Sequence, residues 1–143
     1  MSNDARDEVG QLAVLAVDDH EINRDFIRAA LAPAAAHLEL AGSGFEAMQR
    51  CARRHFDIVL MDLHMPDMDG ASAWNNICDQ ADEEFSTRVI ALTADSRPEE
   101  RERLRQAGFH GFLNKPVSPD ALVQTIQRVA AGQDGFTEVI DST

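Results

Sequence analysis

Short apolar segments alternate with amphipathic segments along the whole chain. The apolar segments lie at 12–17, 38–41, 58–61, 88–92 and 111–114. The segments 12–17 and 58–61 show no alternation of apolar and polar residues, which is typical of strands buried on both faces of a parallel sheet. Apolar residues at helical spacing predict a first helix over 22–31 and a last helix that begins after Ser118, with Pro119 in its first position.

The intervening segments predict three further helices. One begins after Gly44, one covers 71–78 and one covers 99–107, where Gly108 is expected to end it. Five strand-helix units in a chain of this length predict an α/β domain with a doubly wound parallel sheet, right-handed crossovers and helices on both faces. We expect a flexible lead-in at 1–11, one domain at 12–131, and a tail or the start of a linker at 132–143.

Charge and composition narrow the range of partners. The chain has 143 residues and a formal net charge of −12, which argues against direct binding of nucleic acid. It contains neither a long apolar run nor a basic leader followed by an apolar one, so we expect a cytoplasmic protein that does not enter a membrane. Cys51 and Cys78 lie far apart without a CxxC motif, and we expect both to be small buried hydrophobic residues.

Polar residues follow four of the five predicted strands. They are Asp18 and Asp19, then Asp62, then Thr93, then Lys115. The carboxyl ends of parallel strands meet at one edge of a sheet, which is where open α/β sheets bind ligands. Three carboxylates gathered at this edge repel one another unless a cation lies among them, and oxygen ligands suit Mg²⁺.

The motifs around these residues resemble the receiver domains of two-component response regulators over roughly 12–131. The motifs are Val17-Asp18-Asp19, the stretch from Met61 to Gly70, Leu92-Thr93-Ala94 and Asn114-Lys115-Pro116, in that order. The resemblance implies a flavodoxin-like (βα)5 fold, doubly wound, with a five-stranded parallel sheet in the order 2-1-3-4-5. It also implies a phosphoacceptor in a phosphorelay, rather than an enzyme that turns over a separate substrate.

The resemblance assigns the acidic residues to a phosphorylation site. Asp62 is expected to be the nucleophile that becomes an aspartyl phosphate. Asp18 and Asp19 are expected to hold Mg²⁺ (or Mn²⁺), together with Asp62 and the backbone carbonyl of His64.

The remaining motif residues are expected to complete the phosphoryl pocket and to signal its occupancy. Lys115 supplies a positive charge, and Thr93 and Ala94 line the pocket. Thr93 and Phe112 are the expected switch pair, although an aromatic residue on a strand is also a common core residue. The resemblance implies a cis bond before Pro116. It places the output, and a possible homodimer, on the fourth helix, fifth strand and fifth helix.

The sequences of these motifs are most similar to those in the receivers of hybrid sensor histidine kinases, which usually have Asn at the position of His20. The implied partner is a histidine kinase or a histidine phosphotransfer domain, docked on the first helix near Ile22 and Phe26. No direct contact with nucleic acid or membrane is expected. The sequence leaves open a single-domain regulator and a part of a larger protein.

Alternatives from other classes remain. A haloacid dehalogenase type phosphatase also uses an Asp nucleophile, but it needs a second Asp at the position of His64. A flavodoxin needs a Ser/Thr-rich phosphate loop after its first strand, where Asp18 and Asp19 would repel the FMN phosphate. A docking domain that is never phosphorylated is disfavoured by the complete set of five polar residues.

Overall fold

The computed structural model describes residues 10–34 and 37–136, and one parallel sheet lies at its centre. The strands are β1 (Ala13–Val17), β2 (His37–Ala41), β3 (Ile58–Asp62), β4 (Arg88–Thr93) and β5 (Gly111–Asn114). They lie in the order β2-β1-β3-β4-β5, and each neighbouring pair is parallel. The predicted doubly wound α/β fold and its strand order are confirmed.

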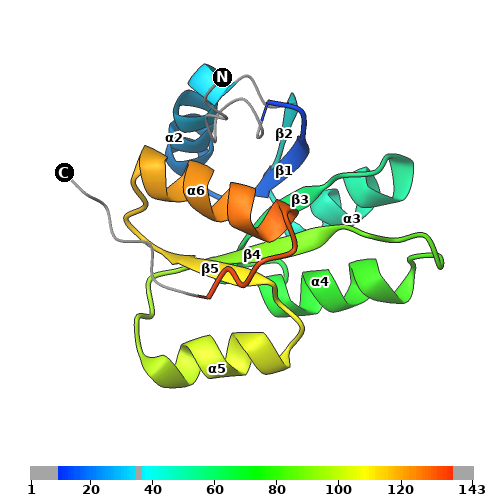
Figure 1. Ribbon diagram of the computed structural model, residues 1–143. Coiled ribbons are helices and arrows are strands. Elements are labelled where there is room, and N and C mark those ends of the chain that lie inside the picture. Colours follow the sequence, from blue (N-terminus) through cyan, green and yellow to red (C-terminus); the bar gives the residue numbers. More distant parts are fainter. Residues whose placement is uncertain (1–9, 35–36, 137–143) are drawn as a thin grey trace.

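Helices cover both faces of the sheet. They are α2 (Glu21–Leu31), α3 (Gly44–Arg53), α4 (Gly70–Asp79), α5 (Pro98–Gln106) and α6 (Pro119–Ala130), and a short 3₁₀ helix, η1 (Ala32–Ala34), follows α2. In Figure 1, α2 and α6 lie on one face, whereas α3, α4 and α5 lie on the other. Among the described helices, none combines the length and the apolar character that a membrane crossing requires.

Both faces of the central strand β3 are buried, which explains why apolar and polar residues do not alternate along it. Ile58 and Leu60 pack into the hydrophobic cluster formed with α2 and α6. Val59 and Met61 pack into the cluster under α3, α4 and α5. All of β3 is buried, including its last residue, Asp62. Both layers therefore require apolar side chains, and a buried carboxylate follows them directly.

Side-chain caps mark the start of three of the helices, α3, α4 and α6. The hydroxyl of Ser43 accepts a hydrogen bond from the Glu46 amide at the start of α3, and Asp69 accepts one from the Ser72 amide at the start of α4. Ser118 caps α6 in the same way, as the sequence predicted. These caps satisfy amide groups that would otherwise lack partners, and they set the length of each loop near the site.

Two expectations differ from the structure. Within the expected tail, Gly135 and Phe136 are buried and pack against β5, because an edge strand offers unpaired backbone groups to a following segment. Cys51 is only half-buried and Cys78 is exposed. The rest of the tail, 137–143, and residues 1–9 of the expected lead-in lie outside the described residues.

Replacing Gly70 with Ala tests how tightly the loop after Asp62 is packed. A Cβ atom on Gly70 would lie 2.5 Å from the Asp62 carbonyl oxygen and 2.9 Å from Met61 Cγ. We expect Gly70→Ala to lower the free energy of unfolding by about 1–3 kcal/mol, the usual cost of overpacking, as measured by urea denaturation. Gly44→Ala is the matched control at the first position of α3, where the nearest atom would be 3.2 Å away. Equal stability of both variants would contradict the prediction.

Candidate functional site

A lysine and two buried carboxylates meet at the carboxyl edge of the sheet. Lys115 Nζ lies 3.2 Å from Asp18 Oδ2 and 3.2 Å from Asp62 Oδ1. The side chain of Asp18 is fully buried and that of Asp62 is 4% exposed. Two carboxylates that are buried away from water require a nearby cation, and Lys115 supplies one.

The register of the sheet places these groups together. β1 and β3 are neighbours, with Val17 paired to Met61, so that Asp18 and Asp62 follow in adjacent positions. On the other side of β3, β4 pairs with β5, and the Lys115 amide donates to the Thr93 carbonyl at 2.9 Å. Residues almost a hundred positions apart thus share one edge because their strands end level with each other.

Asp18 is held by the first turn of α2. Its Oδ1 accepts hydrogen bonds from the His20 amide at 2.9 Å and from Asn23 Nδ2 at 3.3 Å. The guanidinium of Arg24 donates to the Asp18 carbonyl oxygen at 2.6 Å. Sequence reasoning had not assigned His20, Asn23 and Arg24 to the site. Their spacing was a usable signal, since residues two, five and six positions after a strand-end carboxylate fall on the first turn of the following helix.

The carboxylates form a group that suits a metal ion. Ligand atoms of Asp18, Asp19, His20 and Asp62 all lie within 4.8 Å of one another. Asp19 Oδ1 is buried and has no hydrogen-bond partner among the described residues. His20 Nδ1 is 3.1 Å from that oxygen but does not have hydrogen-bond geometry. A buried acceptor without a donor, beside other carboxylate oxygens, fits Mg²⁺.

Burial and charge shift the ionisation of the central pair. Burial raises the pKa of Asp62, and the charge of Asp18 raises it further, against the opposing effect of Lys115 and of the His64 amide. For Lys115, burial acts to lower the pKa, but the carboxylates of Asp62 and Asp18 outweigh it and raise the pKa. Lys115 is therefore charged at neutral pH, and ionisation of Asp62 costs more in the folded chain than in water.

Thr93 ends β4 beside this cluster. Its side chain is buried, and its hydroxyl accepts a hydrogen bond from the Asp95 amide at 3.0 Å. Asn114 Nδ2 donates to the Asp95 carbonyl at 2.9 Å, which fixes the loop that carries exposed Ala94. Hydrogen bonding to Arg97 lowers the pKa of Asp95 to about 2. Thr93 and Ala94 thus stand at the end of β4, next to the strand β3 that ends at Asp62.

Phe112 lies apart from the carboxylates. Its ring is half-buried, stacks on Phe136 at 5.9 Å between ring centroids, and lies under the guanidinium of Arg101 at 4.7 Å.

The peptide bond between Lys115 and Pro116 is cis. His64 is exposed, and its amide donates to Asp62 Oδ1 at 3.3 Å.

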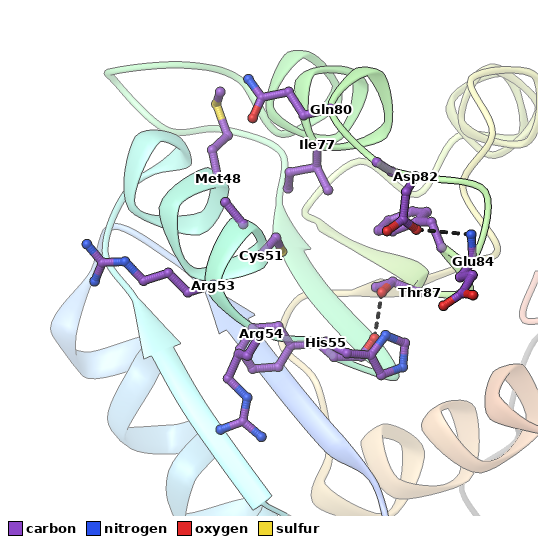
Figure 2. Close-up of a pocket in the computed structure, with 14 residues that line it drawn as sticks. Met48, Cys51, Arg53, Arg54, His55, Ile77, Gln80, Asp82, Glu84 and Thr87 are labelled. Carbon is purple, nitrogen blue, oxygen red and sulfur yellow. Dashed lines mark hydrogen bonds between the residues drawn. The ribbon is translucent and has the colours of Figure 1, made fainter.

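A pocket of about 480 Å³ lies at the opposite edge of the sheet. Figure 2 shows it between the ends of α3 and α4, with Arg54, His55 and Thr87 among its lining residues. The hydroxyl of Thr87 donates a hydrogen bond to the Phe56 carbonyl at 2.6 Å. This polar group of the pocket therefore holds two neighbouring segments of the chain together. At the other edge, Asp18 and Lys115 line a cavity of about 80 Å³ between α2 and α6.

The sheet order and this lysine-carboxylate cluster define an α/β domain of the receiver class. The sequence matches the family described as response regulator receiver domain over residues 14–127. The chain belongs to this family. Receivers are the phosphoacceptor modules of two-component phosphorelays, so the predicted fold and this general function are confirmed, and the phosphatase and flavodoxin alternatives are disfavoured.

Curated relatives are hybrid kinases that are much longer than this chain. It is 36% identical over 129 residues to the signal transduction histidine-protein kinase BarA of Escherichia coli (strain K12), covering 90% of this chain and 14% of BarA. It is 33% identical over 127 residues to the sensor histidine kinase RcsC of the same strain, covering 86% of this chain and 13% of RcsC. The chain thus corresponds to a small part of these relatives.

Solved structures show the same fold. The receiver domain of the sensor histidine kinase PA1611 from Pseudomonas aeruginosa PAO1, with a magnesium ion coordinated in its active site cleft, has a TM-score of 0.74 and 32% identity. The match covers 84% of this chain and 98% of that one. The chemotaxis protein CheY4 of Vibrio cholerae has a TM-score of 0.76 and 33% identity, covering 82% of this chain and 98% of CheY4.

The electrostatics of Asp62 predict that its neutralisation stabilises the fold. At a pH above the raised pKa, Asp62 is charged in both the folded and the unfolded chain, and its charge is unfavourable only in the folded chain. At a pH below its ordinary pKa of 3.8, Asp62 is neutral in both, so it no longer affects stability. We expect Asp62→Asn to raise the Tm by about 3 °C at pH 7 without metal, an effect of about 1 kcal/mol. The gain disappears as the pH falls through the pKa of Asp62.

Thermal denaturation between pH 3.5 and pH 7 measures this effect. Asp25→Asn removes an exposed carboxylate from α2 and is the matched control. A Tm of Asp62→Asn equal to or below that of the unmodified chain at pH 7 would show that the repulsion between Asp62 and Asp18 is already compensated.

Proposed function

We propose that Asp62 is the phosphoacceptor of this receiver and that Asp18, Asp19 and the backbone carbonyl of His64, together with Asp62 itself, hold Mg²⁺ (or Mn²⁺). The observation that carries the proposal is the pairing of Lys115 Nζ with Asp18 and Asp62 at 3.2 Å each. The unpartnered Asp19 Oδ1 supports a metal among these carboxylates.

Each residue then has a role in transfer from a phosphohistidine. An oxygen of Asp62 attacks the phosphorus, the P–N bond breaks, and its electron pair returns to the imidazole nitrogen of the donor. A bound Mg²⁺ supplies positive charge that the carboxylates and phosphoryl oxygens share. Lys115, which both carboxylates keep protonated, contributes a second positive charge fixed before the donor arrives.

Thr93, Ala94 and Phe112 would report the phosphoryl group. The Thr93 hydroxyl, which now accepts from the Asp95 amide, would turn to donate to a phosphoryl oxygen, and Ala94 would offer its backbone. Phe112 would then turn inward and alter the surface formed by α5, β5 and α6. Energetically this is a two-state equilibrium that local charge shifts.

The partner surface lies on α2, next to the site. Ile22 is 82% exposed and Phe26 is 40% exposed, although both are large apolar residues. Phe26 also lines the small cavity beside Asp18 and Lys115. We propose that a histidine kinase or a histidine phosphotransfer domain docks here in the cytoplasm, where ATP charges such donors. The net charge of −12 disfavours a role for nucleic acid.

A homodimer through the α5, β5 and α6 surface is a further possibility in receivers. In this chain Gly135 already pairs with the edge of β5 at Gly111. We therefore propose that the unphosphorylated chain does not use this edge to form a dimer.

Phosphorylation by a small-molecule phosphodonor tests the site directly. With Mg²⁺ we expect one phosphoryl adduct by intact mass, labile to hydroxylamine, and none after chelation or in Asp62→Asn. We expect Asp19→Asn to weaken Mg²⁺ binding by at least about tenfold, the loss that even an outer-shell partner causes, as measured by calorimetric titration. Asp25→Asn, which removes an exposed acid from the following helix α2, should bind Mg²⁺ normally. An adduct on Asp62→Asn would refute the assignment.

Docking on α2 is tested separately from chemistry. We expect Ile22→Ala to slow transfer from a phosphorylated histidine phosphotransfer domain by about tenfold or more, as loss of an interface anchor does, while leaving phosphorylation by a small donor unchanged. Quenched-flow kinetics give both rates. Phe45→Ala removes another exposed apolar residue, on α3, and should change neither. Slower phosphorylation by both donors would show that Ile22 maintains the structure of the site rather than binding the partner.

A further inference from the structure

The chain turns back after α6 and adds a short parallel segment to the edge of β5. Gly135 forms a parallel bridge with Gly111. The Gly135 amide donates to the His110 carbonyl at 3.1 Å, and the Phe112 amide donates to the Gly135 carbonyl at 3.2 Å. Figure 1 shows this segment, in red, running beside β5. The edge strand of the sheet is therefore paired at this point.

Side chains on both sides of the bridge fix the segment. Phe136 is 4% exposed and stacks on Phe112, with ring planes 24° apart. The guanidinium of Arg105 lies 4.7 Å from the Phe136 ring centroid and 3.5 Å from Asp134 Oδ2. The guanidinium of Arg101 covers Phe112 in the same way. An acid, a glycine and an aromatic residue in sequence thus each have a complementary group on α5 or β5.

The middle position accepts only glycine. A Cβ atom on Gly135 would overlap Val129 Cγ2 and would lie 2.9 Å from Gly111 Cα and 2.9 Å from the His110 carbonyl oxygen. Backbone atoms cannot move aside as the end of a flexible side chain can. The surface is therefore specific for an extended segment with a glycine between its acidic and aromatic residues.

We propose that Arg101, Arg105, Phe112 and the edge of β5 form a binding site for an acidic-glycine-aromatic segment, which residues 134–136 fill in this chain in opposition to phosphorylation. The surface is the one through which receivers signal, so the inference rests on the function proposed above. A partner with the same three-residue chemistry would compete for the site once the internal segment leaves.

The opposition follows from the position of Phe112. Its ring cannot both stack on Phe136 under Arg101 and turn inward toward Thr93. Phe112 and Lys115 belong to one short stretch of chain, so displacement of the ring affects the strand that delivers the lysine. By linkage, if phosphorylation releases the segment, release of the segment must favour phosphorylation by the same factor.

Hydrogen exchange of two amides measures the occupied state. In the full chain without phosphodonor, the amides of Phe112 and Gly135 should exchange slowly, because both donate to backbone carbonyls. With Mg²⁺ and a small-molecule phosphodonor, the Gly135 amide should exchange about fivefold faster or more, the lower end of common allosteric coupling. Unchanged protection in chains shown by mass to be phosphorylated would overturn the coupling.

Two variants of the full chain test the reverse direction. Gly135→Val should release the segment through its clash with the backbone, and Phe136→Ala should remove only the stack. The small donor is expected to react with the state from which the segment is released, so the rate follows the population of that state and both variants should raise it by about fivefold or more. Phe45→Ala is the matched control, because it removes a phenylalanine from α3 without touching this surface. Rates equal to that of the control in both variants would overturn the opposition.

A synthetic peptide of residues 132–136 tests the binding site itself. Added to Gly135→Val, it should shift the Phe112 amide resonance and slow phosphorylation again, whereas the same peptide with Ala in place of Phe136 should do neither. Identical effects of the two peptides would overturn the specificity. If no phosphoryl adduct forms on the unmodified chain, the proposed function and the coupling fail together, while amide protection and peptide binding still decide whether the segment occupies a real site.

Discussion

Burial of two carboxylates side by side, with one lysine between them, is the constraint on which the rest of the structure depends. Asp18 and Asp62 stand at the ends of adjacent strands where water is excluded, so burial and the charge of Asp18 raise the cost of charging Asp62. Lys115 offsets part of this cost and leaves room for a second cation. A site that keeps excess negative charge in the resting chain is suited to bind a metal cation.

The two packed layers hold this unfavourable cluster in place. Apolar residues on both faces of β3 bury the strand completely, and the carboxylate of Asp62 cannot retreat to water without unpacking it. The Asn23 amide and the Arg24 guanidinium bind Asp18 from the first turn of α2. The stability of the core thus maintains a charged site that would otherwise relax, as is common at functional sites.

The segment after α6 packs on the edge strand of the sheet. It covers the edge of β5 and stacks Phe136 on Phe112, the aromatic residue assigned to the switch. A free strand edge invites pairing with other chains, and the internal segment satisfies its backbone groups. The same contact that protects the edge thereby sets the resting position of Phe112.

The sequence by itself predicted the fold class and the candidate site. The unbroken apolar runs that end at Asp18 and Asp62 are typical of a covered parallel sheet, and the motifs that carry Asp62, Thr93 and Lys115 resemble those of receivers. Only the tertiary structure decided what depends on packing between distant segments. The return of Phe136 to β5 and its stacking on Phe112 leave no periodic pattern. They arise from the three-dimensional approach of side chains, which local sequence does not encode.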